Sequence, residues 1–216
     1  MFKRTPHSTL RLAIAIFAAA TACAQSVSEQ DGRIYFTDQN GIRKPVTDGR
    51  HDSQPYLSFD GQQVVFVRRI PGRTTESGVS ELWIATVDGG KPPKRVLSGG
   101  NYIDAPGSIV LGFQNPKLSP DATRVYFEGD LWATAAAIKV LDVATGSTKL
   151  LFPGVGVDVI RTGKYRGFLI GTKAPLTKDR GRIMVDWLLN PNGKEVTRIG
   201  ENDSGLDRFK RIYDIR

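Results

Sequence analysis

Residues 55–66 read Pro55-Tyr56-Leu57-Ser58-Phe59-Asp60-Gly61-Gln62-Gln63-Val64-Val65-Phe66, and a second copy of this stretch occupies residues 116–127. Both copies keep Pro-x-Leu-Ser-x-Asp, then a small residue, two polar residues and an apolar triplet that ends in Phe. Their aspartates lie 61 positions apart in a chain of 216 residues. A repeat at a fixed offset predicts an architecture built from similar units.

Each copy has the composition of a β-hairpin. Proline fixes φ and lacks an N–H group, which suits the beginning or the edge of a strand. Ser-x-Asp-Gly and Ser-Pro-Asp-Ala are turn sequences, because Ser and Asp side chains bond to nearby backbone N–H groups. The apolar triplets Val64-Val65-Phe66 and Val125-Tyr126-Phe127 are typical of strands.

A second type of hairpin occurs four times, with turn glycines at positions 41, 89, 146 and 193. Copies of the first hairpin type fall between the first and second of these and between the second and third. Residues 158–170 take the corresponding place before the fourth, and we interpret them as a degenerate copy. Two alternating hairpins predict a unit of four antiparallel strands.

The first 24 residues have the features of a signal peptide. Lys3, Arg4 and Arg11 precede an apolar run of nine residues, 12–20, which is too short to span a bilayer. Small residues then fit cleavage before Gln25, which predicts export from a bacterial cytoplasm. Residues 25–32 are interpreted as a linker.

Cys23 leaves a second route of processing open. A run of small residues directly before a lone cysteine also resembles a lipoprotein signal, in which Cys23 would be lipidated. Under either route the mature chain forms no internal disulfide. The predicted location is therefore the periplasm, either as a soluble protein or as an outer-membrane lipoprotein.

The basic charge of the chain is moderate once the leader is left out. The formal net charge is +8, and three of those charges belong to the leader. The remaining +5 is scattered over the chain, which indicates a solvated surface. A periplasmic location also argues against nucleic acid as a partner.

The hairpin repeat resembles the PD-type, WD-like repeat of the TolB-like β-propellers, which also occurs in the propeller domains of prolyl-oligopeptidase-type enzymes. The resemblance covers residues 33–199. It implies an all-β fold, a small propeller of about four four-stranded blades or an incomplete one, over residues 33–216. Family members have six blades, whereas residues 33–199 hold one half-unit and three whole units. Residues 207–215 would supply part of the missing half of a blade and close the ring by pairing the two chain ends; the alternatives are an open fan, a ring shared between chains and a degenerate remnant.

No catalytic constellation is present in the sequence. His51-Asp52-Ser53 contains triad residue types, but contiguous residues do not converge as a triad does. The mature chain holds one histidine and, if cleaved before Gln25, no cysteine, which excludes a zinc site of the His/Cys type. We therefore predict no catalytic residue, no metal ligand and no cofactor.

Propellers present ligands and partners with the loops that lead into their innermost strands. By the repeat, the residues in or beside these loops are His51, Asp52, Gln54, Gln114, Asn115 and Asp158. We predict that they bind another cell-envelope protein and that the chain is not an enzyme. One alternative is a propeller hydrolase or lyase that uses channel carboxylates, Asp52 or Asp158, and a divalent ion. Another is an accessory propeller fragment that assembles with a second chain.

Overall fold

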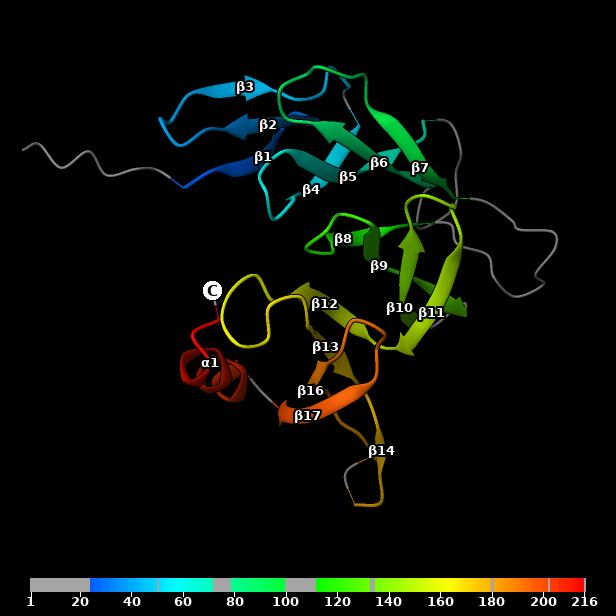
Figure 1. Ribbon diagram of the computed structural model, residues 1–216. Helices are drawn as coiled ribbons and strands as arrows, with labels where there is room; N and C mark the ends of the chain where they lie inside the picture. Colours follow the sequence, from blue (N-terminus) through cyan, green and yellow to red (C-terminus); the bar gives the residue numbers. More distant parts are fainter. Residues whose placement is uncertain are drawn as a thin grey trace, which may run out of the picture.

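The computed structural model describes residues 24–49, 51–71, 79–99, 112–132, 135–179, 181–201 and 203–215 (Figure 1). The predicted leader, with Cys23, lies outside the described residues, so both processing routes remain predictions. Within the described residues, no helix has the length and apolarity needed to cross a membrane.

Four antiparallel sheets follow one another along the chain, and we call them blades 1 to 4. Blade 1 contains β1 (Ser26–Gln30), β2 (Arg33–Thr37) and β3 (Arg43–Pro45). Blade 2 contains β4 (Asp52–Leu57), β5 (Gln63–Arg69), β6 (Ser80–Thr86) and β7 (Lys94–Ser98). Blade 3 contains β8 (Gln114–Leu118), β9 (Arg124–Trp132), β10 (Ala135–Asp142) and β11 (Thr148–Pro153). Blade 4 contains β12 (Val155–Val159), β13 (Leu169–Lys173), β16 (Val185–Leu189) and β17 (Glu195–Gly200).

Two further elements belong to the last part of the chain. A short hairpin, β14 (Leu176–Thr177) and β15 (Gly181–Arg182), is inserted between β13 and β16. The helix α1 (Asp203–Ile212) follows β17. The remaining structure is strands and turns, which confirms the all-β fold class.

The predicted alternation of two hairpin types is confirmed. The second type forms β2–β3, β6–β7, β10–β11 and β16–β17. Its four turn glycines all have φ between +70° and +79°, a range that side chains disfavour. The first type forms β4–β5 and β8–β9, and the degenerate copy forms β12–β13. Each of blades 2 to 4 is therefore one four-stranded repeat unit.

Serine and aspartate close the turns of the first hairpin type in the same way in both copies. The Ser58 hydroxyl donates to Asp60 Oδ1 at 2.5 Å and accepts from the Gln63 N–H at 2.9 Å. The Ser119 hydroxyl donates to Asp121 Oδ1 at 2.6 Å and accepts from the backbone N–H five residues later at 3.0 Å. These bonds explain why Ser-x-Asp is repeated in the sequence.

The serine–aspartate hydrogen bonds of these turns should make the stability of the fold depend on pH in the acid range. Hydrogen bonds from the serine hydroxyls lower the pKa of Asp60 and Asp121 below the ordinary 3.8. Their contribution is therefore complete above that value and is lost as pH falls through the lowered folded pKa. In the double variant Asp60→Asn/Asp121→Asn, we expect stability to change less with pH in this range. Urea midpoints from about pH 6 down to about pH 2 measure this; parallel curves for the two proteins would contradict it.

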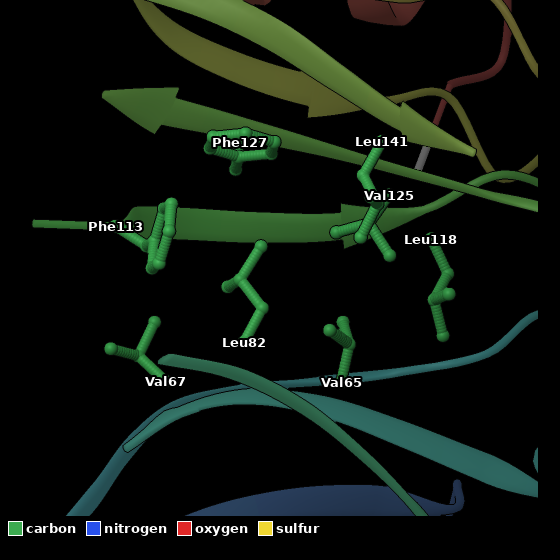
Figure 2. Packing of buried hydrophobic residues seen from close by; sticks show 8 residues of the cluster. All are labelled: Val65, Val67, Leu82, Phe113, Leu118, Val125, Phe127 and Leu141. Atoms are coloured by element: carbon green, nitrogen blue, oxygen red, sulfur yellow. The ribbon is translucent and has the colours of Figure 1, made fainter. Parts of the chain in front are cut away.

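Neighbouring blades pack through apolar side chains. Figure 2 shows the cluster between blades 2 and 3, where side chains of both blades point into the space between the sheets. Its members are at most 4% exposed: Val65, Val67, Leu82, Phe113, Leu118, Val125, Phe127 and Leu141. Phe113 and Phe127 meet edge to face, with ring centroids 5.3 Å apart. Burial of such side chains is the main stabilising term of the fold.

The same kind of interface joins the other blades. Between blades 1 and 2 the buried residues are Ile34, Phe36, Leu57, Val64, Phe66 and Ala85. Between blades 3 and 4 they are Tyr126, Ile138, Phe152, Val157, Val159, Leu169 and Leu189. No cluster of the described residues joins blade 1 to blade 4, and the four blades form an open arc (Figure 1).

The prediction that residues 207–215 supply part of a blade and close the ring is wrong, because most of this segment belongs to α1. Leu206, Phe209 and Tyr213 recur at helical spacing and place their side chains against the outer face of blade 4. Phe209 is 8% exposed and packs in a cluster with Ile170 and Leu188. The helix therefore covers the face on which a further blade would pack.

One expectation about the N-terminal side also needs correction. The segment over residues 25–32, interpreted as a linker, contains β1, so blade 1 has three strands rather than two. The face of blade 1 that points away from blade 2 is polar. On it, Arg43 lies 3.9 Å from the Tyr35 ring centroid and donates to Gln30 Oε1 at 2.8 Å. Neither end of the arc therefore presents an open apolar sheet face among the described residues.

Candidate functional site

The first strands of the four blades lie next to one another along the inner edge of the arc. Strand β4 contacts both β1 and β8, and β8 contacts β12. Figure 1 shows β4, β8 and β12 following one another, and each is an edge strand of its sheet. The residues predicted to bind a partner lie on or just before these strands.

Each of the strands β4, β8 and β12 is interrupted by a β-bulge at the same position of the repeat. The bulge residues are Gln54, Asn115 and Gly156, with φ of +53°, +50° and +69°. Positive φ is uncommon for a residue other than glycine and needs a functional or structural explanation. Here the reason is visible in the contacts of the two amide side chains.

Gln54 and Asn115 connect three consecutive blades. Gln54 Oε1 accepts a hydrogen bond from the backbone N–H of Asn115 at 2.5 Å. Asn115 Nδ2 in turn donates to the Val157 carbonyl at 2.8 Å and to Glu128 Oε1 at 2.9 Å. The bulges thus aim each amide at the next blade, and the bonds hold the inner strands in register.

Two residues after each bulge residue, a polar or charged side chain occupies the equivalent position of the inner strand. These residues are Tyr56, Lys117 and Asp158. Lys117 Nζ lies 3.8 Å from Asp158 Oδ1 and 4.8 Å from the centroid of the Tyr56 ring. The Arg161 guanidinium lies 5.2 Å from the same ring. We call Tyr56, Lys117, Asp158 and Arg161 the inner-strand cluster.

Arg161 has a structural part in this cluster. Its guanidinium donates two hydrogen bonds of 2.8 Å, to the carbonyls of Leu57 and Ser58, across 104 and 103 residues of sequence. It also lies 4.5 Å from the centroid of the Phe59 ring. A planar fork of donors suits such a pair of acceptors. Arg161 therefore ties blade 4 directly to blade 2.

Tyr56 is the member of the cluster with an unused polar atom. Its hydroxyl oxygen is buried and makes no hydrogen bond of ordinary length and angle with the described residues, although the Arg161 guanidinium lies close enough to affect its pKa. Burial raises the pKa of Tyr56, and the positive charge of Arg161 opposes that rise. A buried hydroxyl without a good hydrogen bond destabilises a fold, so it needs a structural or functional explanation.

The burial of the Tyr56 hydroxyl allows a prediction about the stability of the isolated protein. We expect Tyr56→Phe to leave the free energy of unfolding unchanged or to raise it by up to about 1 kcal/mol, because an unpaired buried group is removed. Urea unfolding measures this. A matched control is Tyr126→Phe, where the hydroxyl donates to the Pro191 carbonyl at 3.1 Å and its loss should destabilise. If Tyr56→Phe destabilised the protein as much as Tyr126→Phe does, the Tyr56 hydroxyl would have to make a good hydrogen bond, contrary to this prediction.

The structure brings some of the predicted residues together and separates others. Gln54, Asn115 and Asp158 lie on adjacent inner strands. His51 and Gln114 are exposed at the beginning of β4 and β8, and no contact with the cluster is found for their side chains within the described residues. Asp52 is fully buried, so it is not accessible to a partner in this structure.

Asp52 has a different environment from the one expected for a binding residue. Its two carboxylate oxygens accept hydrogen bonds from Arg68 Nε at 2.5 Å and Nη2 at 2.8 Å. Arg68 also lies 4.4 Å from the Trp83 ring centroid. A Cβ atom at Gly49 would lie 2.7 Å from Asp52 Oδ2, so glycine leaves room for the pair. The pair is a structural element of blade 2.

Sequence reasoning missed Tyr56, Lys117 and Arg161. For the first two a signal exists, since both occupy the variable position of the Pro-x-Leu-Ser motif. The constant positions of the motif build the hairpin and the interfaces, whereas the variable position faces its counterparts on the neighbouring inner strands. Arg161 carries no comparable signal, because its acceptors are more than 100 residues away.

Within the described residues, no three side chains of His, Cys, Asp or Glu are grouped so that they could hold a metal ion. The expectation that the protein uses neither metal nor cofactor stays a prediction.

Comparison with solved structures shows the β-propeller fold. The chain is similar to a protein assigned as TolB from Agrobacterium tumefaciens, with a TM-score of 0.57 and 16% identity over 82% of this chain and 58% of that one. It is also similar to the propeller domain of the Trilobed protease from Pyrococcus furiosus, which has an open velcro topology, with a TM-score of 0.50 and 15% identity over 80% and 49% of the chains. The TolB-like resemblance is thus confirmed at the level of the fold.

Enzymes share this fold as well. Dipeptidyl peptidase 4 from Porphyromonas gingivalis matches with a TM-score of 0.51 and 14% identity over 83% of this chain and 31% of that one. The chain spans between 31% and 58% of the length of these three structures. No family model and no curated protein matches the sequence. The fold therefore does not distinguish a binding protein from an enzyme.

Proposed function

We propose that this chain is an exported, non-catalytic propeller that binds another cell-envelope protein through the inner-strand cluster. The observation that carries the proposal is the convergence of Tyr56, Lys117 and Asp158, one from each of three consecutive blades.

The inner-strand cluster has hydrogen-bond donors and a small excess of positive charge. Lys117 and Arg161 carry positive charges, and Asp158 carries the negative one. The Lys117–Asp158 distance of 3.8 Å is longer than a good charged hydrogen bond. A carboxylate or carbonyl group of a partner would accept from Lys117, whose side chain is 20% exposed. We therefore expect an acidic or carbonyl-rich segment of the partner at this site.

Export and location belong to the same proposal. The basic and apolar leader, with its small residues before Gln25, supports a periplasmic protein, and lipidation of Cys23 would tether it to the outer membrane. The mass of the protein recovered from the envelope distinguishes the two routes. In both cases the partner is a protein of the same compartment.

Site-specific photo-crosslinking in cells tests the proposal. A photoreactive amino acid replaces Gln114, which is exposed on β8 three residues before Lys117, and in a control it replaces Leu150, which is 51% exposed on the outer strand β11. We expect one discrete adduct with an envelope protein from position 114 and none from position 150. Equal adducts from both positions, or none from position 114, would refute the proposal.

The alternatives from the sequence make different predictions. A hydrolase or lyase with a divalent ion predicts stoichiometric metal in the purified protein. An accessory fragment predicts assembly with a second chain along the ends of the arc, and size-exclusion chromatography with light scattering measures it. Among the described residues, α1 packs on the outer face of blade 4 and the outer face of blade 1 carries the Arg43–Tyr35 contact, which does not favour that assembly.

A further inference from the structure

The hairpin β14–β15 differs from the rest of the molecule because it takes no part in the packing of the blades. It is an insert between the second and third strands of blade 4. None of the four apolar clusters of the described residues includes a side chain from residues 174–184. Figure 1 shows β14 extending beyond the sheet of blade 4. The hairpin is therefore not needed to build the core.

Two large apolar side chains are exposed on this insert. Leu176 is 76% exposed and Met184 is 50% exposed. Leu176 is the most exposed of the six large apolar residues found at the surface of the described chain. Single exposed apolar residues are ordinary, but two on one projecting hairpin without a packing role indicate a contact with something else.

The charges on the same hairpin are mainly positive. Lys178 and Arg182 are exposed, and Asp179 is the one acid between them. The neighbouring Lys173 is already paired with Glu195 at 2.6 Å. A basic segment with exposed apolar side chains matches an anionic lipid surface, where cations meet headgroups and apolar side chains enter the boundary of the acyl chains.

The backbone of the hairpin is suited to such a boundary, because several polar groups are satisfied internally. The Ile183 N–H donates to the Pro175 carbonyl at 3.3 Å. The Thr177 hydroxyl donates to the Gly181 carbonyl at 2.9 Å, and Arg182 Nη1 donates to the Ala174 carbonyl at 3.2 Å. Backbone groups paired in this way lower the cost of leaving water.

We propose that the β14–β15 hairpin docks this protein on an anionic lipid bilayer, with Leu176 and Met184 in the interface and Lys178 and Arg182 at the headgroups. The proposal is independent of the partner site, since the hairpin shares no residue with the inner-strand cluster. It also holds for either processing route, because a tethered protein and a diffusible one both meet the bilayer surface.

Co-sedimentation of the mature chain with vesicles tests the proposal. The vesicles contain either phosphatidylcholine alone or phosphatidylcholine with about one third phosphatidylglycerol. The variant Leu176→Ser/Met184→Ser keeps all charges and removes the apolar pair. The control Ile42→Ser/Leu150→Ser removes two side chains of similar exposure, 59% and 51%, from blades 1 and 3.

We expect binding to the anionic vesicles only, and about a tenfold lower partition coefficient for the hairpin variant. The control variant should bind as the unchanged protein does. Equal losses in both variants, equal binding to neutral vesicles, or no binding to anionic vesicles at low salt would each overturn the proposal. Binding that vanishes with Lys178→Gln/Arg182→Gln but not with the apolar variant would reduce it to general electrostatic attraction and would also overturn it.

Discussion

Replacement of Asp52 by asparagine is expected to lower the free energy of unfolding by about 3–5 kcal/mol, because it leaves Arg68 without its partner in a largely buried site. Asp52 is fully buried, and the Arg68 side chain is 24% exposed. Asparagine keeps the size of the side chain but removes the charge and one of the two acceptor oxygens. Urea or thermal unfolding of the purified variant measures the loss.

A matched control is available on the surface. The Lys173–Glu195 pair has a similar length of 2.6 Å, but Glu195 is 47% exposed. We expect Glu195→Gln to cost less than about 1 kcal/mol, since solvent screens an exposed pair. A loss below 1 kcal/mol for Asp52→Asn would contradict the structural role. If Asp52 serves the fold alone, the Asp52→Asn variant should give an unchanged yield of partner adduct at a temperature where the variant is folded.

Replacement of Phe209 by alanine is expected to lower the free energy of unfolding by about 3–5 kcal/mol and to detach α1 from blade 4. Phe209 is 8% exposed and lies 4.8 Å from the Tyr213 ring and 6.2 Å from the Tyr165 ring, centroid to centroid. A ten-residue helix is not stable in water without its packing partner. Denaturant unfolding, together with limited proteolysis of the C-terminal segment, measures both effects.

The same helix supplies the control. Ile212 is 61% exposed, so Ile212→Ala should change stability by no more than about 0.5 kcal/mol. Detachment of α1 would expose Ile170 and Leu188, and we expect the Phe209→Ala variant to self-associate as the concentration rises. Resistance of α1 to proteolysis in this variant, with unchanged stability, would contradict the idea that the helix covers the end of the arc.

The parts of the fold that could be predicted are those that depend on local chemistry. Turn glycines at positions 41 and 193 need positive φ, and Ser58 with Asp60 satisfies the backbone N–H groups of its own turn. These requirements act over a few residues, so they leave a pattern in the sequence. Two such patterns in alternation were sufficient to predict blades of four strands.

The ends of the arc and the cluster depend on contacts between distant residues. Residues 207–215 are predicted from the sequence to close the ring, whereas most of them belong to α1, because the apolar face of blade 4 that they cover is distant in sequence. Asp52 was interpreted as a binding residue because its partner Arg68 is 16 residues away on β5. Arg161 was not recognised at all. Pairings of this kind are decided by tertiary structure and leave no local signal.

The most direct test of the account is the effect of Lys117→Glu on the adduct formed from a photoreactive residue at position 114. Lys149→Glu is the control, since Lys149 is exposed on the outer strand β11. If the inner-strand cluster binds an envelope protein, charge reversal at Lys117 should lower the adduct yield about tenfold and the control should not. Equal adduct yields in the unchanged protein and in both folded variants would contradict the central claim.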